Sequence, residues 1–124
     1  MAAKSEHNIQ ALSLIQASQN KGVYIFRNQV GTFYTRSGQP VKVGVVGSAD
    51  AIGFCCMEVT QEMVGRTVPI FFGAEYKTAK GRQREEQKQW EQHITSFGAP
   101  YRLIRSPEEM QIYIDDIKNG FFHK

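Results

Sequence analysis

The segment from Ile70 to Thr78, IFFGAEYKT, constrains the fold of this chain more than any other part of the sequence. It starts as an apolar run and ends with two charges, Glu75 and Lys77. Residues i and i+2 of a strand lie on one face, about 6.7 Å apart. We therefore expect a core strand, with Ile70 to Phe72 interior, whose end presents a carboxylate and an ammonium on one surface. An exposed ion pair is the simpler alternative, but polar groups at such strand ends often build sites.

Length and composition predict one domain, residues 1–124, with one core. The chain has 124 residues, of which 41% are hydrophobic and 22% are charged, which suits a single compact domain. No window approaches the roughly 18 apolar residues of a membrane span, and the first ten residues lack the apolar centre of a signal peptide. We therefore expect a soluble, unexported, cytoplasmic protein without a membrane partner. The net charge of +3 favours an anionic partner only mildly.

Two adjacent cysteines, Cys55 and Cys56, stand within an apolar run. Adjacent cysteines are poorly placed for an unstrained disulfide or for a zinc site with spaced ligand pairs. We expect both to pack in the core of a protein from a reducing compartment.

Apolar periodicity and turn residues predict the element order α-β-β-β-β-α-β-α. Helices are expected at 5–19, 83–97 and 106–120, with Ser5 and Ser106 as N-caps. Strands are expected at 23–28, 32–36, within 49–59, at 70–78 and at 101–105. The first two strands flank NQVG and suggest a hairpin. This order fits an α/β fold with a mixed sheet and helices on its faces.

A second carboxylate, Asp50, precedes the apolar run of the third expected strand. If that strand and the Glu75 strand are antiparallel neighbours, Asp50 lies beside Glu75. Two close carboxylates repel each other unless a cation lies between them, and such oxygen ligands suit Mg²⁺ or Mn²⁺. With Lys77 added, the set resembles a metal-dependent phosphodiester cleavage site. An ordinary turn aspartate is the alternative.

Gln87 lies in the second expected helix, whose apolar stripe consists of Trp90, Ile94 and Phe97. At 100° per residue, Gln87 flanks this stripe near the start of the helix. Its amide could reach a water or a substrate near the sheet, whereas an ordinary surface glutamine is the alternative.

The succession of Asp50 in GSAD, Glu75 and Lys77 in AEYK, and Gln87 in GRQREEQKQW resembles the VRR-NUC domain. This is the virus-type replication-repair nuclease branch of the PD-(D/E)XK superfamily. The resemblance covers nearly the whole chain and includes FRNQVG and TSFGAPYRLIR. It implies a restriction-endonuclease-like α/β fold with a central mixed β-sheet flanked by α-helices. One departure is Ala49, which precedes Asp50 at the position where the PD-(D/E)XK motif has a proline.

The resemblance also implies the roles of individual residues. Asp50 and Glu75 would bind Mg²⁺ or Mn²⁺ together with the backbone carbonyl of Tyr76, and Lys77 would be the catalytic lysine.

Two further residues complete this implied site. Gln87 would support it, and Glu6 matches the acidic residue that the family contributes from its first helix. A glutamate in a first helical turn is also what the helix macrodipole favours.

Basic residues near the Glu75 segment predict where DNA lies. Cationic contacts to phosphates release counterions and give salt-dependent affinity. We find no base-reading motif, so recognition of DNA shape and backbone is expected. A solvated helix start is the alternative. The candidate contacts are Lys80, Arg82, Arg84 and Lys88, with Arg27, Asn28 and Arg36 as a second strip.

The expected function is a divalent-metal-dependent, structure-selective endodeoxyribonuclease that cuts branched DNA, such as four-way junctions or flaps, in replication, recombination or repair. Similarity to standalone phage and bacterial members implies the cytoplasm of a bacterial host or phage-infected cell. The small size and the aromatic segment VYIFRNQVGTFY suggest a homodimer that spans both DNA strands. Two alternatives are a catalytically silent nucleic-acid-binding module and a restriction-type or nicking endonuclease.

Overall fold

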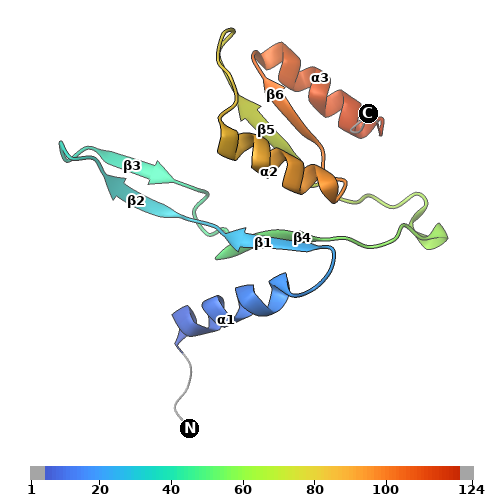
Figure 1. The fold of residues 1–124 in the computed structure, drawn as a ribbon, viewed down its shortest axis with the longest axis horizontal. Coiled ribbons are helices and arrows are strands. Elements are labelled where there is room, and N and C mark those ends of the chain that lie inside the picture. The colour runs from blue at the N-terminus through green and yellow to red at the C-terminus, as the bar shows by residue number, and fades with distance from the viewer. Residues whose placement is uncertain (1–4, 121–124) are drawn as a thin grey trace. The chain divides into compact units, whose positions relative to one another are not determined.

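The structure is a computed structural model that describes residues 5–120. The chain divides into two compact units, Met1–Glu58 and Val59–Lys124. It belongs to the mixed α/β class, as the sequence predicted, whereas the single domain expected for residues 1–124 stays a prediction. The first unit contains α1 (Glu6–Ser18), β1 (Val23–Arg27), β2 (Gly31–Tyr34), β3 (Pro40–Val43) and β4 (Ala51–Cys55) (Figure 1). The second contains the 3₁₀ helix η1 (Gln61–Met63), β5 (Gly73–Tyr76), α2 (Glu85–Ser96), β6 (Tyr101–Ile104) and α3 (Pro107–Lys118).

Serine N-caps begin the first and the third helix, as predicted. The Ser5 hydroxyl accepts a hydrogen bond from the backbone N–H of Asn8 at 3.2 Å. The Ser106 hydroxyl accepts one from the N–H of Glu109 at 3.1 Å, and Pro107 occupies the first helical turn. These contacts satisfy amide groups that have no partner inside the helix, so both helices begin where the local sequence dictates.

The strand pairing of the first unit differs from the expected hairpin. β1 pairs antiparallel with β4, and β2 pairs antiparallel with β3, a strand that the predicted element order lacks. The predicted hairpin of 23–28 with 32–36 is therefore wrong. Gln29 and Val30 are a weak turn pair, whereas Gly38 has a φ of +83° and lets the chain reverse between β2 and β3.

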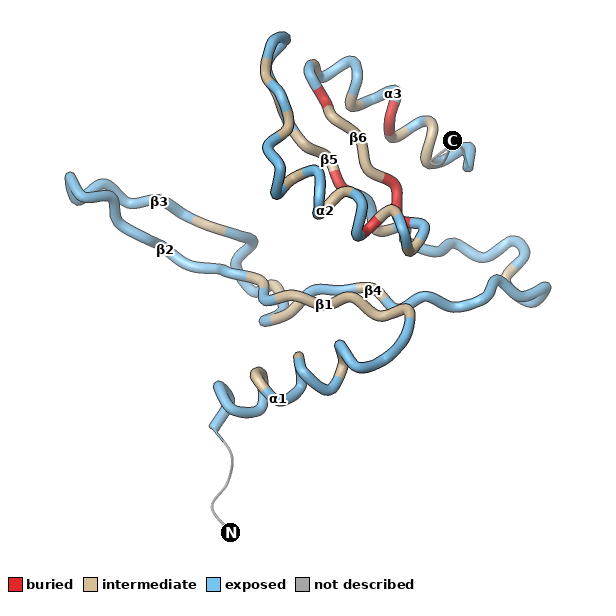
Figure 2. Tube along the Cα trace, in the orientation of Figure 1, coloured by how far each residue is buried: buried red, intermediate tan, exposed pale blue. Residues whose placement is uncertain are grey.

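Side chains of the first unit stay solvent-accessible. No residue between 5 and 58 is buried, and the buried positions in Figure 2 belong to the second unit. Cys55 and Cys56 are both exposed free thiols, so the prediction that they pack in a core is wrong. The apolar run of β4 contains no buried residue either. A two-stranded ladder with one packed helix, α1, cannot enclose both of its faces.

The second unit is built on a parallel ladder of β5 and β6, which α2 connects. Each unit contains only two-stranded sheets among its described residues. Alternate side chains point to opposite faces of the ladder. A Cβ atom placed on Gly73 would point at Trp90 and Ile94 of α2, whereas Arg102 pairs with Asp116 of α3. The odd-numbered residues of the ladder therefore face α2, and the even-numbered ones face α3.

Gly73 is the point where both helices meet the ladder. The Tyr113 hydroxyl of α3, only 1% exposed, donates a hydrogen bond to the Gly73 carbonyl at 2.9 Å. On the α2 side, a Cβ atom at this position would lie 2.8 Å from Cδ2 of Tyr101 and 3.1 Å from Cζ3 of Trp90. Such distances are too short for a side chain, so only glycine permits this packing.

The strand of Glu75 is shorter than the sequence predicted. β5 begins at Gly73, opposite Tyr101, because the ladder starts where its partner strand starts. Ile70 and Phe72 lie before the ladder and are each 39% exposed, so the expectation that this run is interior is wrong for both.

The burial of Tyr113 predicts that the free energy of unfolding falls at alkaline pH. Burial raises the pKa of Tyr113 from its ordinary value of 10.0 to about 12, although the nearby Arg102 charge lowers it. In the unfolded chain the phenol ionises first, so the stabilisation is complete below pH 10 and is lost as the pH rises toward 12. We expect the free energy of unfolding to fall by about 2 kcal/mol over this window. Urea titrations followed by Trp90 fluorescence measure this change.

The control for this experiment is Tyr113→Phe, which cannot ionise. At pH 8 it should be less stable by about 1 kcal/mol, since the Gly73 carbonyl loses its donor. Between pH 10 and 12 it should lose clearly less stability than the wild type. Equal losses in the two proteins would contradict the assignment.

Candidate active site

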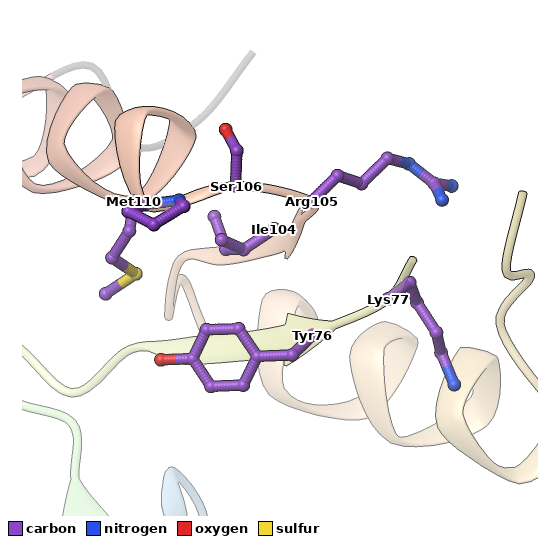
Figure 3. A pocket seen from close by; sticks show the side chains of 7 residues that line it. Tyr76, Lys77, Ile104, Arg105, Ser106 and Met110 are labelled. Carbon is purple, nitrogen blue, oxygen red and sulfur yellow. The ribbon is translucent and has the colours of Figure 1, made fainter. Parts of the chain in front are cut away.

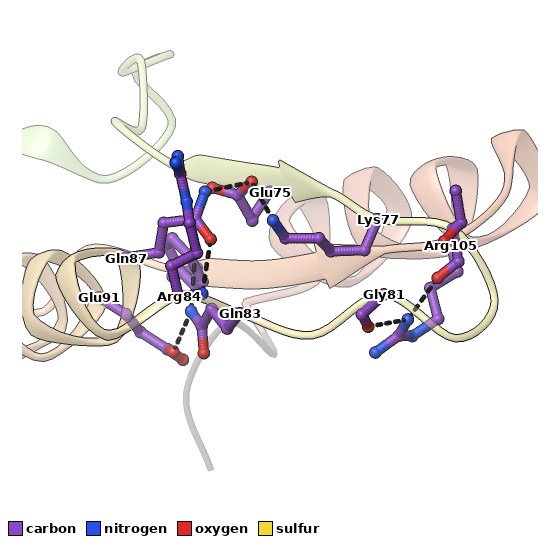
Figure 4. Close-up of polar contacts among 10 residues, drawn as sticks. Glu75, Lys77, Gly81, Gln83, Arg84, Gln87, Glu91 and Arg105 are labelled. Carbon is purple, nitrogen blue, oxygen red and sulfur yellow. Dashed lines mark hydrogen bonds and ion pairs between the residues drawn. The ribbon is translucent and has the colours of Figure 1, made fainter.

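The second unit brings together three of the predicted site residues, Glu75, Lys77 and Gln87. The Lys77 ammonium lies 3.6 Å from Oε2 of Glu75, and the Gln87 amide donates a hydrogen bond to the same oxygen at 2.9 Å (Figure 4). The side chains of Glu75 and Lys77 are 24% and 18% exposed. The predicted shared face of the strand is therefore confirmed, and a partly buried carboxylate is held there by one cation and one amide.

The orientation of Gln87 follows from the start of α2. Gln87 occupies the third position of this helix, and its Oε1 accepts a hydrogen bond from the backbone N–H of Arg84 at 2.9 Å. This is the glutamine half of a capping box. Because the amide oxygen faces the helix start, the amide nitrogen is directed at Glu75. The sequence indicated the place of Gln87 beside the apolar stripe, but not its capping contact.

Gln83 is a supporting residue that the sequence analysis missed. Its amide nitrogen donates to Oε1 of Glu91 and to the Tyr101 hydroxyl, both at 2.9 Å. These contacts connect the loop before α2 with α2 and β6. Burial raises the pKa of Tyr101, while the hydrogen bond with Gln83 lowers it. A single glutamine in a basic loop carries no signal of such a role.

Arg105, also missed, anchors the loop that follows Lys77. Its guanidinium donates to the carbonyls of Thr78 at 2.6 Å and Gly81 at 2.8 Å. Because Gln83 fixes the other end, the connection from β5 to α2 is held at both ends (Figure 4). Its conformation therefore depends on contacts that span between 8 and 27 positions of the chain.

Exposed basic side chains lie within this connection and at the start of α2. Within residues 5–120, the side-chain ion pairs are Lys77 with Glu75 and Arg102 with Asp116. The other basic side chains near the site therefore have no carboxylate partner in this part of the chain and are available to an anionic ligand. These exposed residues are the predicted DNA contacts Lys80, Arg82, Arg84 and Lys88.

Asp50 lies in the first unit, directly before β4 and at the solvent-exposed end of a turn. Its carbonyl accepts a hydrogen bond from the N–H of Asn28 at 2.9 Å. The Asn28 amide nitrogen donates to the Ser48 hydroxyl and to the Ala49 carbonyl, both at 2.8 Å. Asn28 thus fixes the turn that presents Asp50, and its contact with DNA stays a prediction.

The remaining predicted residues of the first unit are exposed. Glu6 is the first residue of α1, and Arg27 is the last residue of β1. Arg36 lies in the turn between β2 and β3. A site that joins Asp50 or Glu6 to Glu75 would span the two units, and it stays a prediction.

The oxygen donors of the second unit fit a hard divalent cation. Gly73 and Lys77 both donate their N–H groups toward β6, so the carbonyl of Tyr76 points to the other edge of β5 by the alternation of a strand. Oε1 of Glu75 accepts no hydrogen bond from any residue between 5 and 120. A carboxylate and a carbonyl oxygen are ligands that Mg²⁺ and Mn²⁺ prefer. Groups of three or more His, Cys, Asp and Glu do not gather within the described residues.

Comparison of this sequence with family models, with curated proteins and with solved structures gave no match. Between residues 5 and 120, no helix is both long enough and apolar enough to cross a membrane.

Substitution of Gln87 separates its capping contact from its contact with Glu75. Gln87→Glu keeps a capping acceptor but places a second negative charge at Glu75, so we expect a loss of about 1–2 kcal/mol at pH 7 that recovers as the pH falls toward 4. Gln87→Ala should lose about 1–2 kcal/mol at both pH values, because it removes both contacts without adding charge. Urea denaturation at the two pH values measures this. The same pH dependence in both variants would show that Gln87 does not face the carboxylate.

Proposed function

We propose that this protein is a divalent-metal-dependent, structure-selective endodeoxyribonuclease of the VRR-NUC type, with a PD-(D/E)XK, restriction-endonuclease-like fold. One observation carries the proposal: Glu75 shares one oxygen between Lys77 and Gln87 near the end of β5. The adjoining loop of cations without carboxylate partners supports it. A purely structural role does not explain why charged residues stand at the end of this strand.

In the proposed reaction, Glu75 and the Tyr76 carbonyl would hold the cation in the second unit, and Asp50 and Glu6 of the first unit are further proposed acidic ligands. Mg²⁺ or Mn²⁺ held there would supply Lewis-acid activation of water and charge neutralisation at the phosphate. The Lys77 ammonium stabilises negative charge as it develops on the phosphorus oxygens.

Within this site, Gln87 keeps the Glu75 carboxylate in one orientation. A carboxylate fixed in advance does not reorganise during the reaction, which is the benefit of a preorganised polar site.

The loop cations would bind the phosphate backbone next to the reacting bond. Such contacts make affinity depend on salt without reading the base sequence. Arg27, Asn28 and Arg36 form a second strip for a second DNA arm. Branched DNA such as four-way junctions and flaps is the substrate that we propose, in the cytoplasm of a bacterial or phage-infected cell.

Substitution of two lysines of the second unit distinguishes a role in catalysis from a role in DNA binding. Lys77→Ala should lower metal-dependent cleavage by about 100-fold or more, with little change in DNA affinity. Lys80→Ala, the matched control, should weaken binding and reduce its salt dependence but leave the rate at saturating DNA nearly unchanged. Cleavage of labelled junction, flap, duplex and single-stranded DNA in Mg²⁺, Mn²⁺ or EDTA measures both effects, with Asp50→Ala as a second inactive variant.

Several results would change the assignment. Intact turnover in Lys77→Ala would refute its catalytic role. Salt-sensitive binding without cleavage by the wild type would favour the silent nucleic-acid-binding module. Cleavage of duplex at a fixed base sequence would favour a restriction-type or nicking endonuclease.

We further propose a homodimer, formed through the hairpin of β2 and β3. Phe33 and Tyr34 on this hairpin are 51% and 71% exposed, and exposed aromatic side chains are enriched at protein interfaces. Sedimentation equilibrium at micromolar protein should give a mass near twice 14.1 kDa. Phe33→Asp should shift this mass toward that of one chain, whereas a wild-type mass near 14.1 kDa would exclude the dimer.

A further inference from the structure

A pocket of about 470 Å³ lies where β5 and β6 end and α3 begins. All of its lining residues belong to the second unit. Four apolar or aromatic side chains and two cationic residues carry the argument (Figure 3): Tyr76, Ile104, Pro107, Met110, Lys77 and Arg105. Its volume is typical of pockets that bind small organic groups.

The ring of Tyr76 forms one side of this pocket. Tyr76 is an even-numbered residue of the ladder and therefore lies on the α3 face, opposite to Glu75. Its side chain is exposed, with 68% of the residue accessible, and its hydroxyl has no hydrogen-bond partner within residues 5–120. Ile104 and Met110 lie across the pocket from the ring (Figure 3). A flat group could therefore pack on the exposed ring of Tyr76.

Two basic residues line the other end of the pocket. Lys77 and Arg105 line this end, and their side chains extend away from the ring of Tyr76 (Figure 3). The Lys77 ammonium is paired with Glu75 at 3.6 Å. The Arg105 guanidinium donates to backbone carbonyls and has no ion pair among the described residues, so its charge is not neutralised. Glu108 and Glu109 follow in the first turn of α3 and do not line the pocket, although the Glu109 carboxylate accepts a hydrogen bond from the Arg105 backbone N–H at 2.7 Å. The Arg105 guanidinium is therefore the cation that favours an anionic group at this end.

We propose that this pocket binds one unstacked nucleobase of the substrate DNA. The base would stack on Tyr76, and its phosphate would lie toward Arg105. A nucleotide combines a flat π-system with an anionic group, which matches the two ends of the pocket. Stacking on an aromatic ring tolerates every base, because each has a π-face.

This inference rests on the proposed function, because Lys77 borders both the pocket and the carboxylate site. It deepens that function by naming the substrate class. DNA with an unpaired nucleotide beside the cut, as at a flap or an imperfect junction, would fill the pocket. An intact duplex would first have to unstack a base, which costs a few kcal/mol.

The test combines DNA that lacks one base with a protein variant that lacks the Tyr76 ring. Flap DNAs that each carry one abasic residue, at successive positions around the branch point, are titrated by fluorescence anisotropy in EDTA. The wild type should bind the DNA that lacks the recognised base about tenfold more weakly than the intact flap. Tyr76→Ala should bind both DNAs equally, at the weaker affinity. Tyr76→Phe keeps the ring and should retain the difference.

Ile112→Ala is the matched control, because Ile112 is an exposed apolar residue of α3 that does not line this pocket. It should retain the difference as well. A second probe is 2-aminopurine at the responsive position. Its fluorescence should be quenched by the wild type and by Tyr76→Phe, but not by Tyr76→Ala.

The outcomes separate this inference from the proposed function. Metal-dependent cleavage without any abasic effect that depends on Tyr76 would overturn the pocket alone. An abasic effect that depends on Tyr76, without cleavage of any DNA, would overturn the nuclease and keep the pocket. Unchanged DNA binding by Tyr76→Ala together with loss of the dimer mass would assign the pocket to a protein contact. No binding of any flap by the wild type would overturn both proposals.

Discussion

The close approach of α2, α3 and the parallel ladder at Gly73 is the constraint on which the second unit depends. The backbone carbonyl of this glycine receives the Tyr113 hydroxyl, and the space of an absent side chain is bordered by Tyr101 and Trp90. Because a strand has a fixed rise and alternation, fixing Gly73 also fixes Glu75 two residues later on the α2 face. The position of the carboxylate is thus a consequence of core packing rather than of contacts made by its own charge.

Long-range hydrogen bonds then determine what surrounds that carboxylate. Arg105 holds the start of the loop after Lys77, and Gln83 holds its end against Glu91 and Tyr101. The loop carries cations that repel one another, so an unanchored loop would extend into solvent. Anchoring through uncharged carbonyls and amides keeps these cations near the site without neutralising them. An anionic ligand would therefore meet a preformed positive surface.

The two faces of β5 suggest different tasks for neighbouring residues. Glu75 faces α2 and the polar contacts of the candidate active site, whereas Tyr76 faces α3 and the pocket. Lys77 stands at the end of the strand, where the faces meet. In the proposed enzyme, this alternation would let one short strand position both the reacting phosphate and an adjacent base. The distance between these two subsites would be set by the backbone itself.

The sequence by itself determined the features that depend on local covalent geometry. Ser5 and Ser106 begin helices because their hydroxyls reach amides three residues away, and Glu75 and Lys77 share a face because of the strand period. The cationic character of the following loop was equally plain from the residues alone. Each of these features involves residues within a few positions of one another, so it can be predicted without knowing which distant segments come into contact.

Only the tertiary structure decided which distant residues meet. The pairing of β1 with β4, the exposure of Cys55 and Cys56, and the anchoring by Arg105 all involve segments far apart in the chain. Many alternative strand pairings and helix packings are compatible with the same local sequence preferences. A short sequence pattern therefore does not predict which of them forms. The partner of Gln87 belongs to the same class, because its amide reaches Glu75 only after α2 has docked on the ladder.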